Sequence, residues 1–435
     1  MVTQGTQTGP YLLAIDAGTG SCRALLFTEK GEQVAVSQRE WTHHEPPGVP
    51  GGQDFDVETN WRLITACIRD ALASAGAAGG DVAAVAATSM REGIVLYDAR
   101  GAEIWACPNV DSRASAEAED LIREGNAERI FEEAGDWVSI TSPARLRWIA
   151  RHRPGLFVGA RGLGMLSDWI VYRLARVQVT EPSCGSSSGM FSLARRTWSA
   201  RIAEICGIEA AVLPEAVDPG TVVGAVTAEA AAARARGLDP YVVMEEGAAQ
   251  IPPGSNGLYA ILSNLMNARR WVHASPSFVG FNLGDPAGRG RGTCVRAIEE
   301  AAAYVVRGHL GIIAELTGAR VSELTFSGGG AKGRLWPQVI ADVLGLPVQV
   351  PAVTESSALG AALCAGRGAG VYSSLTELEP TLRQRAATFE PRPEAVAVYD
   401  DRYDRWRQIY PRMLELSEDG LVNPLWRAAG SGVAD

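Results

Sequence analysis

The residues best suited to chemistry lie near the start of the chain, in the segment Asp16-Ala-Gly-Thr-Gly-Ser-Cys-Arg23. An apolar run ends at Asp16 and another begins at Ala24, so the pattern predicts a β-hairpin with a turn rich in glycine and hydroxyl residues. Backbone N–H groups and hydroxyls in such a turn can bind phosphate oxygens, and a carboxylate at the strand end can hold Mg²⁺. An ordinary tight hairpin would use the same residue types. The candidate phosphate-binding residues are Asp16, Gly18, Thr19, Gly20, Ser21 and Arg23, and Asp16 is also the candidate metal ligand.

A second candidate anion site is the glycine-rich segment Ser327-Gly-Gly-Gly-Ala-Lys332. It follows an apolar strand pattern and precedes a helix expected over Arg334 to Leu344. Consecutive glycines allow a nucleotide to approach the backbone closely, and a helix N-terminus favours anions. A flexible turn is the alternative interpretation, but a glycine triplet between a strand and a helix favours a ligand. The candidate nucleotide-binding residues are Gly328, Gly329, Gly330 and Lys332.

Two short polar segments could bind a hydroxylated substrate: Ser89-Met-Arg-Glu-Gly93 and Asn109-Val-Asp-Ser-Arg113. Arg91 can donate hydrogen bonds to hydroxyl or carbonyl oxygens, whereas Glu92 and Asp111 can accept them from hydroxyls. Taken alone, Arg91 and Glu92 could equally form a surface ion pair. The candidate substrate-binding residues are Arg91, Glu92, Asn109 and Asp111.

The elements that must position these residues alternate between strands and helices. A third strand is expected over Gln33 to Val36, a helix with one apolar face over Val57 to Ser74, and a fourth strand over Val82 to Thr88. Three antiparallel strands followed by a helix and a strand are typical of the ribonuclease-H-like fold, an inference by analogy of pattern. Near the end of the chain, Tyr399, Tyr403, Trp406 and Tyr410 have helical spacing, which predicts a helix packed on the protein.

Composition limits the class of protein. The chain has 435 residues, enough for two domains, and a net charge of −10, which together with the lack of a basic stripe excludes a nucleic-acid footprint. The segment Met1 to Pro10 has no hydrophobic signal core, and no apolar run reaches transmembrane length. The seven cysteines have no close pairs, which favours free thiols over disulfides or a metal site. We therefore expect a cytoplasmic enzyme without a nucleic-acid or membrane partner.

Together these motifs resemble the FGGY carbohydrate kinases. The hairpin Asp16–Arg23 is similar to the family's first phosphate motif, and Ser327–Lys332, with Trp336 and Gln338, is similar to its adenosine motif. The segment from Glu355 to Gly370 resembles the C-terminal helix of the family. Three separate motifs in the family's order are far more specific than any one of them.

The resemblance implies an α/β fold of two ribonuclease-H-like lobes, as in actin and hexokinase, with the second lobe incomplete. It implies an N-terminal domain over residues 1–239, a C-terminal domain over 240–426 and a tail over 427–435. It also implies ATP and Mg²⁺ as cofactors, and transfer of the γ-phosphoryl group to a terminal hydroxyl of a small sugar-like substrate. Four segments (Glu40-Trp41, Phe55-Asp56, Asn60-Trp61 and Ser167-Asp168-Trp169) resemble the branch that phosphorylates a linear dihydroxypentanedione, a quorum-sensing signal.

The chain departs from the family at one place. In the family, the second domain opens with a strand and a glycine-rich turn that ends in the aspartate acting as catalytic base. Here the expected strand Pro240–Met244 runs directly into Glu245-Glu246-Gly247, which resembles a later helix. We therefore predict that the base and a second phosphate turn are deleted after Met244, which leaves the catalytic residue unassigned. Glu245 and Glu246 fit an exposed helix face better than the role of a base.

Several functions remain open at this point. The favoured one is a sugar kinase with impaired activity, because loss of a general base costs about 10²–10⁴-fold in rate. The alternatives are a catalytically dead protein that binds the sugar or signal, a kinase for another sugar such as a pentulose, and an ATPase of the actin or Hsp70 type. The gap could also reflect an error in the gene sequence or a degrading gene.

Overall fold

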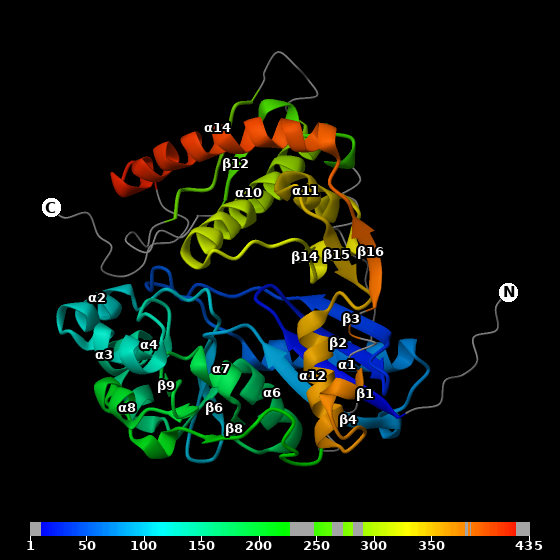
Figure 1. Cartoon of the computed structure of the whole chain (residues 1–435). Helices are drawn as coiled ribbons and strands as arrows, with labels where there is room; N and C mark the ends of the chain where they lie inside the picture. Colours follow the sequence, from blue (N-terminus) through cyan, green and yellow to red (C-terminus); the bar gives the residue numbers. More distant parts are fainter. Residues whose placement is uncertain are drawn as a thin grey trace. The chain divides into compact units, whose positions relative to one another are not determined.

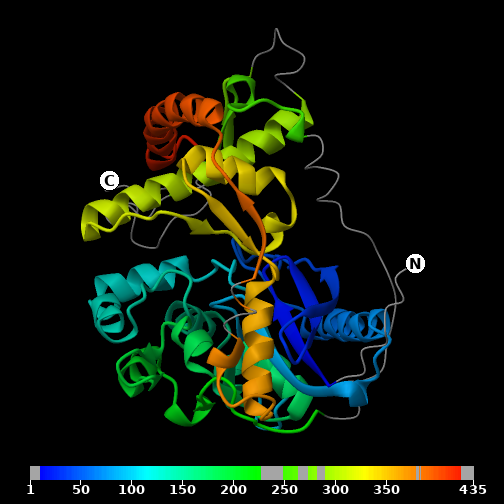
Figure 2. The same ribbon diagram turned by 45° about the vertical axis from the view of Figure 1, so that its right-hand side comes forward.

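The computed structural model describes residues 10–226, 248–262, 273–281, 290–378, 382 and 384–422. The chain divides into two compact units (Figures 1 and 2). The first unit comprises Met1–Arg236 and Ser357–Thr381, and the second comprises Gly237–Ser356 and Leu382–Asp435. The chain thus leaves the first unit, builds most of the second, returns to the first for one helix and ends in the second.

The first unit is built on a four-stranded sheet with the order β3-β2-β1-β4. Its strands are β1 (Tyr11–Ala17), β2 (Ser21–Thr28), β3 (Gln33–Glu40) and β4 (Val82–Ser89). The first three are antiparallel and β4 is parallel to β1, as a crossover through a helix requires. That helix is α1 (Val57–Ser74), which packs on β2 and β3 and is capped by Asp56, whose side chain accepts a hydrogen bond from the Thr59 N–H at 2.9 Å. The predicted hairpin, third strand, helix and fourth strand are confirmed.

A second, three-stranded sheet of the first unit has the order β6-β5-β7 and follows directly in the chain. Its strands are β5 (Ile94–Tyr97), β6 (Glu103–Cys107) and β7 (Gly162–Met165). An aromatic cluster joins this part of the unit to the first sheet, since Phe55 packs edge-on against both Trp41 and Trp169, at centroid distances of 5.3 and 5.4 Å. The remaining helices are α2 (Ser115–Arg123), α3 (Asn126–Ala134), α4 (Ser142–His152), α5 (Pro154–Gly159), α6 (Leu166–Ala175), α7 (Pro182–Ser186) and α8 (Ala200–Cys206). The remaining short strands are β8 (Val179–Thr180), β9 (Phe191–Ser192), β10 (Thr197–Trp198) and β11 (Glu215–Ala216).

Helix α12 (Ser356–Gly368) is the segment that returns to the first unit. It approaches β1 closely, because a Cβ atom added at Gly366 would lie only 2.8 Å from Leu12 Cδ1 and 2.5 Å from the Tyr372 hydroxyl. At its end, a Cβ at Gly368 would lie 2.1 Å from the carbonyl oxygen of Gly220. The small residues of this helix therefore permit close packing. In Figure 2 the helix, drawn in orange, runs alongside the blue strands of the first unit.

The second unit has two small sheets in its described part, β12-β13 and β14-β15-β16. The strands are β12 (Tyr259–Ile261), β13 (Ser277–Val279), β14 (Leu324–Thr325), β15 (Val348–Pro351) and β16 (Arg385–Phe389). Three helices pack with them: α10 (Arg291–Thr317), α11 (Leu335–Leu344) and α14 (Pro393–Glu418). The predicted C-terminal helix is α14, and its four aromatic residues at helical spacing are all buried.

Several expectations fall outside the described residues. They are the strand expected over Pro240–Met244, and Glu245 and Glu246. Across the ranges given above, no helix is long and apolar enough to cross a membrane. The seven cysteines all lie in these ranges, and each is a free thiol.

Candidate functional site

The first phosphate-loop candidate lies where β1 turns into β2. Asp16 and Arg23 are paired across the two strands, and Arg23 Nη1 lies 3.4 Å from Asp16 Oδ2. Arg23 Nε also donates to Gln38 Oε1 of β3 at 2.8 Å, which fixes the guanidinium beside the turn. A Cβ atom at Gly20 would meet no atom within 4 Å, so the backbone borders open space there. The predicted residues are therefore together, on a turn that a ligand can approach.

Two aromatic side chains hold this turn from one side. The Trp41 Nε1–H donates to the carbonyl oxygens of Gly18 and Thr19, both at 3.1 Å. His43 Nε2 lies 2.8 Å from the Thr19 carbonyl oxygen, and burial lowers the pKa of His43. The imidazole is then neutral, with its Nε2–H as the donor. These bonds occupy carbonyl oxygens of the turn within the protein, which suits a turn that must attract an anion rather than a cation.

The parallel pairing of β1 and β4 brings the Arg91-Glu92 segment beside the turn. Ala17 is in register with Ser89, and the Met90 N–H donates to the Ala17 carbonyl oxygen at 2.7 Å. The Arg91 side chain is 76% exposed, whereas Glu92 is buried. Arg91 Nη2 lies 3.5 Å from Glu92 Oε1. Burial raises the pKa of Glu92, and the charge of Arg91 partly offsets that effect. The pair therefore offers one exposed donor and one buried carboxyl group.

The backbone at Glu92 adopts an unusual conformation, with φ of 60° in a residue that is not glycine. Three contacts around it hold it there. The Glu92 N–H donates to Ser187 Oγ at 3.2 Å, the Glu92 carbonyl oxygen accepts a hydrogen bond from Arg145, and Gly93 N–H donates to the Arg91 carbonyl oxygen at 2.7 Å. Such conformations cost about 1–3 kcal/mol and persist where surrounding structure imposes them, which is frequent at functional sites.

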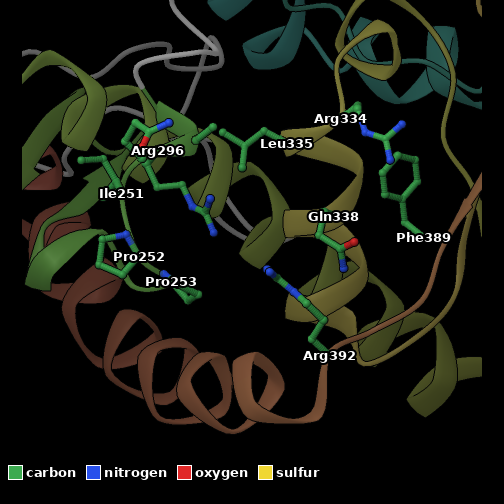
Figure 3. Close-up of a pocket in the computed structure, with 11 residues that line it drawn as sticks. Ile251, Pro252, Pro253, Arg296, Arg334, Leu335, Gln338, Phe389 and Arg392 are labelled. Carbon is green, nitrogen blue, oxygen red and sulfur yellow. The ribbon is translucent and has the colours of Figure 1, made fainter.

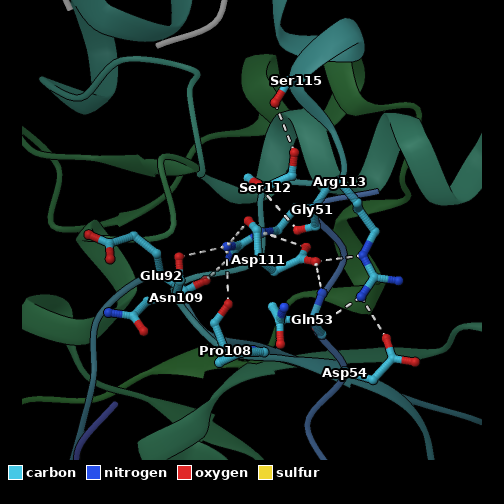
Figure 4. A network of polar contacts seen from close by, with 11 residues as sticks. Gly51, Gln53, Asp54, Glu92, Pro108, Asn109, Asp111, Ser112, Arg113 and Ser115 are labelled. Atoms are coloured by element: carbon cyan, nitrogen blue, oxygen red, sulfur yellow. Dashed lines mark hydrogen bonds and ion pairs between the residues drawn. The ribbon is translucent and has the colours of Figure 1, made fainter. Parts of the chain in front are cut away.

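The loop after β6 carries Asn109 and Asp111, and it meets the phosphate turn. Thr19 Oγ1 donates to Asn109 Oδ1 at 3.1 Å, although 90 residues separate the two in sequence. Asp111 is buried, and its Oδ1 atom accepts hydrogen bonds from the Gln53 N–H and from Arg113 Nε, both at 2.7 Å (Figure 4). Asn109 thus reaches the candidate ligand space, whereas the Asp111 carboxylate is engaged within the protein.

Arg145 is the residue that sequence reasoning missed. Its side chain is 1% exposed and lies 3.4 Å from Asp111 Oδ2. Besides the Glu92 carbonyl oxygen, it donates to the carbonyl oxygens of Pro108 at 3.1 Å, Asn109 at 3.2 Å and Asp111 at 2.9 Å. One guanidinium therefore ties the loop after β4 to the loop after β6. No sequence signal identifies it, because an arginine within a helix is ordinary and its partners lie 34 to 53 residues away.

In the second unit, the glycine triplet leads into a short 3-10 turn (Gly329–Lys332) before α11. Gly328 has φ of 92°, a conformation that favours glycine, and its N–H donates to the Thr354 carbonyl oxygen at 2.6 Å. A Cβ at Gly330 would lie 2.5 Å from the Trp336 ring, so aromatic packing requires glycine there. Lys332 Nζ lies 2.5 Å from Glu355 Oε1. The requirement for glycine at these two positions thus comes partly from the protein itself.

The residues of the first turn are compatible with a phosphate-bound divalent cation. Within the described residues, no cluster of three His, Cys, Asp or Glu side chains could hold a metal on its own. Mg²⁺ in phosphoryl-transfer sites usually needs only one or two carboxylates, because water and phosphate oxygens supply the other ligands. Asp16, whose side chain is 15% exposed at the end of β1, meets that requirement.

Comparison with known proteins agrees with the motifs. Residues 11–249 match the N-terminal domain and residues 226–369 the C-terminal domain of the FGGY family of carbohydrate kinases. Autoinducer-2 kinase of Yersinia enterocolitica is 34% identical over 523 aligned positions, which cover 98% of this chain and 99% of that protein. The corresponding enzyme of Escherichia coli K12 is 34% identical over 518 positions, which cover 97% and 98%.

Those alignments are longer than the chain itself, which has 435 residues. The relatives therefore contain several dozen residues that have no counterpart here.

Solved structures share the fold. Xylulose kinase from Rhodospirillum rubrum superposes with a TM-score of 0.70 at 24% identity, over 93% of this chain and 99% of that one. Glycerol kinase from Plasmodium falciparum with ADP gives 0.71 at 15% identity, over 92% and 98%. The predicted α/β fold with two lobes of the actin-like ATPase type is confirmed. The chain belongs to the FGGY family of carbohydrate kinases.

Proposed function

We propose that this chain is an ATP-dependent kinase for a small linear polyhydroxy carbonyl compound, of the autoinducer-2 kinase type, with reduced catalytic power. The observation that carries the proposal is the hydrogen bond between Thr19 and Asn109. It links the turn suited to phosphate with the loop suited to the acceptor, within one unit. The 34% identity with autoinducer-2 kinases supports dihydroxypentanedione as the acceptor.

In this proposal each group of residues has a separate task. Gly18, Thr19, Gly20 and Ser21 would bind phosphate oxygens, with Arg23 adding positive charge. Asp16 would hold Mg²⁺, which supplies charge neutralisation at the phosphates when it is bound. Gly328 to Gly330 and Lys332 would face the adenosine.

On the acceptor side, Arg91, Glu92 and Asn109 would contact the hydroxyl and carbonyl oxygens of the substrate. Asp111 would help to hold that site through its bonds to Arg113 and Arg145. Positioning and electrostatic stabilisation provide most of the catalysis in phosphoryl transfer, so a chain that retains them can keep some activity without a base.

The proposed loss of activity rests on the segment after Met244. The relatives' additional residues support a deletion, and the predicted site of that deletion is where the family carries its catalytic aspartate. The same observation favours a second candidate function, a protein that binds the signal without phosphorylating it.

The deciding experiment measures phosphorylated product by mass spectrometry. The purified chain is given ATP and Mg²⁺ with dihydroxypentanedione, xylulose or glycerol. Product from dihydroxypentanedione alone is the expected result, at a rate about 10²–10⁴-fold below that of an intact relative. If no product forms but calorimetry detects binding of dihydroxypentanedione, the chain is a protein that binds the signal without phosphorylating it. Product from xylulose in preference would contradict the proposed acceptor.

A further inference from the structure

A cavity of 480 Å³ opens in the second unit, between α10, α11 and the strand β16 (Figure 3). None of Gly328, Gly329, Gly330 or Lys332 lines it, so it is separate from the glycine turn. Its wall combines apolar and cationic side chains. The apolar ones are Ile251, Pro252, Pro253, Leu335 and Phe389, and the cationic ones are Arg296, Arg334 and Arg392.

Two of the arginines face each other across this space. Figure 3 shows the side chains of Arg296 and Arg392 reaching toward the middle of the cavity from different elements, with Gln338 of α11 beside Arg392. The hydrogen bond to Asp342 raises the pKa of Arg392. The positive charge of Arg296 is near enough to lower that pKa, but its effect is smaller. Two like charges near one cavity repel each other, and an anion bound between them would be attracted by both.

Arg296 is held rigidly in place. It is 2% exposed, its Nε lies 3.0 Å from Glu300 Oε1, and its Nη2 donates to the Tyr399 hydroxyl at 2.7 Å. Glu300 also accepts hydrogen bonds from the Gly254 N–H at 2.9 Å and the Ser255 hydroxyl at 2.8 Å, next to the two prolines of the cavity wall. The buried carboxylate thus fixes both the guanidinium and the segment that follows the two prolines.

Arg392 is fixed in the same way. The buried carboxylate of Asp342 accepts from its backbone N–H at 2.8 Å, its Nε at 3.1 Å and its Nη2 at 2.6 Å. Gln338 Nε2 donates to Asp342 Oδ1 and to the Glu390 carbonyl oxygen, both at 2.9 Å. Among the residues that the structure describes, none donates a hydrogen bond to the Gln338 carbonyl oxygen, so this oxygen can accept from a ligand.

The bonds of both arginines to described residues use Nε and Nη2, so each keeps Nη1 for a ligand. The cavity therefore offers two fixed cationic donors and one acceptor.

The charge of the cavity is positive overall. Glu300 and Asp342 each compensate one arginine, whereas Arg334 is exposed and contacts the Phe389 ring, with 6.0 Å from its Cζ to the ring centroid. Within the part of the chain that the structure describes, Arg334 forms no ion pair. A tetrahedral phosphate presents oxygens in several directions and can bridge donors from different sides, whereas a carboxylate presents both oxygens on one side.

We propose that this cavity is a binding site for the phosphate group of a small phosphorylated metabolite. One phosphate oxygen accepts from Arg296 Nη1 and another from Arg392 Nη1, while a hydroxyl of the ligand donates to the Gln338 carbonyl oxygen. The organic part of the ligand lies against the prolines and Phe389. The cavity shares no residue with the Asp16–Arg23 turn or the glycine triplet, although Gln338 lies in the segment that resembles the adenosine motif.

The test is calorimetric titration of the full chain with inorganic phosphate and with ribose 5-phosphate. Arg392→Lys keeps a charge beside Asp342 but loses the forked donor, and we expect about tenfold weaker binding of both ligands. Arg334→Gln changes an exposed side chain and should weaken binding about threefold through lost charge alone. The matched control is Arg385→Gln. Arg385 lies on β16 with Phe389 but is not part of the cavity wall, and its Nη2 lies 3.4 Å from Glu323 Oε1. This variant should bind both ligands as tightly as the unaltered chain does.

Two results would overturn the proposal. Equal phosphate affinity in the unaltered chain, Arg392→Lys and Arg334→Gln would show that the cavity binds no phosphate. Loss of phosphate binding in Arg23→Gln alone would assign the anion to the turn of the first unit. Thermal melting of each variant, and retained binding in Arg385→Gln, separate a local loss of the site from general unfolding.

Discussion

Replacing Arg145 by methionine tests whether one guanidinium holds the acceptor side of the candidate site together. Methionine has similar length but no donors, so four backbone carbonyl oxygens and one oxygen of Asp111 lose their partner. Removing one member of a buried ion pair costs about 3–5 kcal/mol. Asp111 keeps Arg113 and the Gln53 N–H, so we expect a cost near the lower end, about 3 kcal/mol.

Arg147, two residues further along α4, provides the matched control. It forms a surface pair with Glu124, with N–O distances of 2.7 and 2.9 Å, and its substitution by methionine should cost at most about 1 kcal/mol. Both variants are unfolded in urea and followed by tryptophan fluorescence. The free energy of unfolding is compared at the transition that occurs at the lowest urea concentration. Arg145→Lys, which keeps one charge, should lie between them.

An Arg145→Met variant no less stable than Arg147→Met would show that this guanidinium does not hold the two loops together. Destabilised Arg145→Met that still bound dihydroxypentanedione as tightly as the unaltered chain would show that Glu92 and Asn109 do not depend on Arg145 for their position.

Three further predictions concern other parts of the molecule. Burial raises the pKa of Asp168 to about 7, so ionising this carboxyl group destabilises the folded state. The free energy of unfolding should therefore fall relative to that of Asp168→Asn as pH rises from 4 to 8, by at most about 4 kcal/mol. Thermal melts of both proteins across that pH range measure the difference. Gly330→Ala places a Cβ against the Trp336 ring and should cost about 1–3 kcal/mol with a change in tryptophan fluorescence, whereas Gly329→Ala, whose Cβ would meet no atom within 4 Å, should not. Trp41→Phe removes the donor to two carbonyl oxygens of the candidate phosphate turn and shortens a buried side chain, so it should weaken ATP binding about tenfold and cost about 1–3 kcal/mol of stability. An unchanged Kd of the folded variant, measured by calorimetry, would contradict the role of Trp41 in shaping the turn.

The sequence predicts the first sheet well because its signals are local. The run that ends in Asp16, the turn through Gly20 and the next apolar run specify a hairpin without reference to the rest of the chain. The helix expected over Val57 to Ser74 has these limits in the structure. The sheets of the second unit do not follow from local signals, because their strands are short and come from segments far apart in the chain.

The sequence indicates which residue types belong to the candidate site, but not which hydrogen bonds and ion pairs join them. Asp111 can be recognised from its polar segment, yet its burial depends on Gln53 and on Arg145, which lie 58 residues before it and 34 after it. The cavity between Arg296 and Arg392 likewise arises from elements about a hundred residues apart, and no local pattern marks it. Such contacts follow from tertiary packing, which periodicity does not encode.

The return of α12 to the first unit affects the order in which the protein can be made. The ribosome releases β1 at the start of synthesis, but the helix that packs on Leu12 follows more than three hundred residues later. Until α12 is synthesised, the apolar surface that it covers on the first unit is exposed. By then the ribosome has already made Gly237–Ser356 of the second unit. A fragment ending at Arg236 would carry the same defect permanently, so the first unit should be expressed with Ser357–Thr381 restored through a linker.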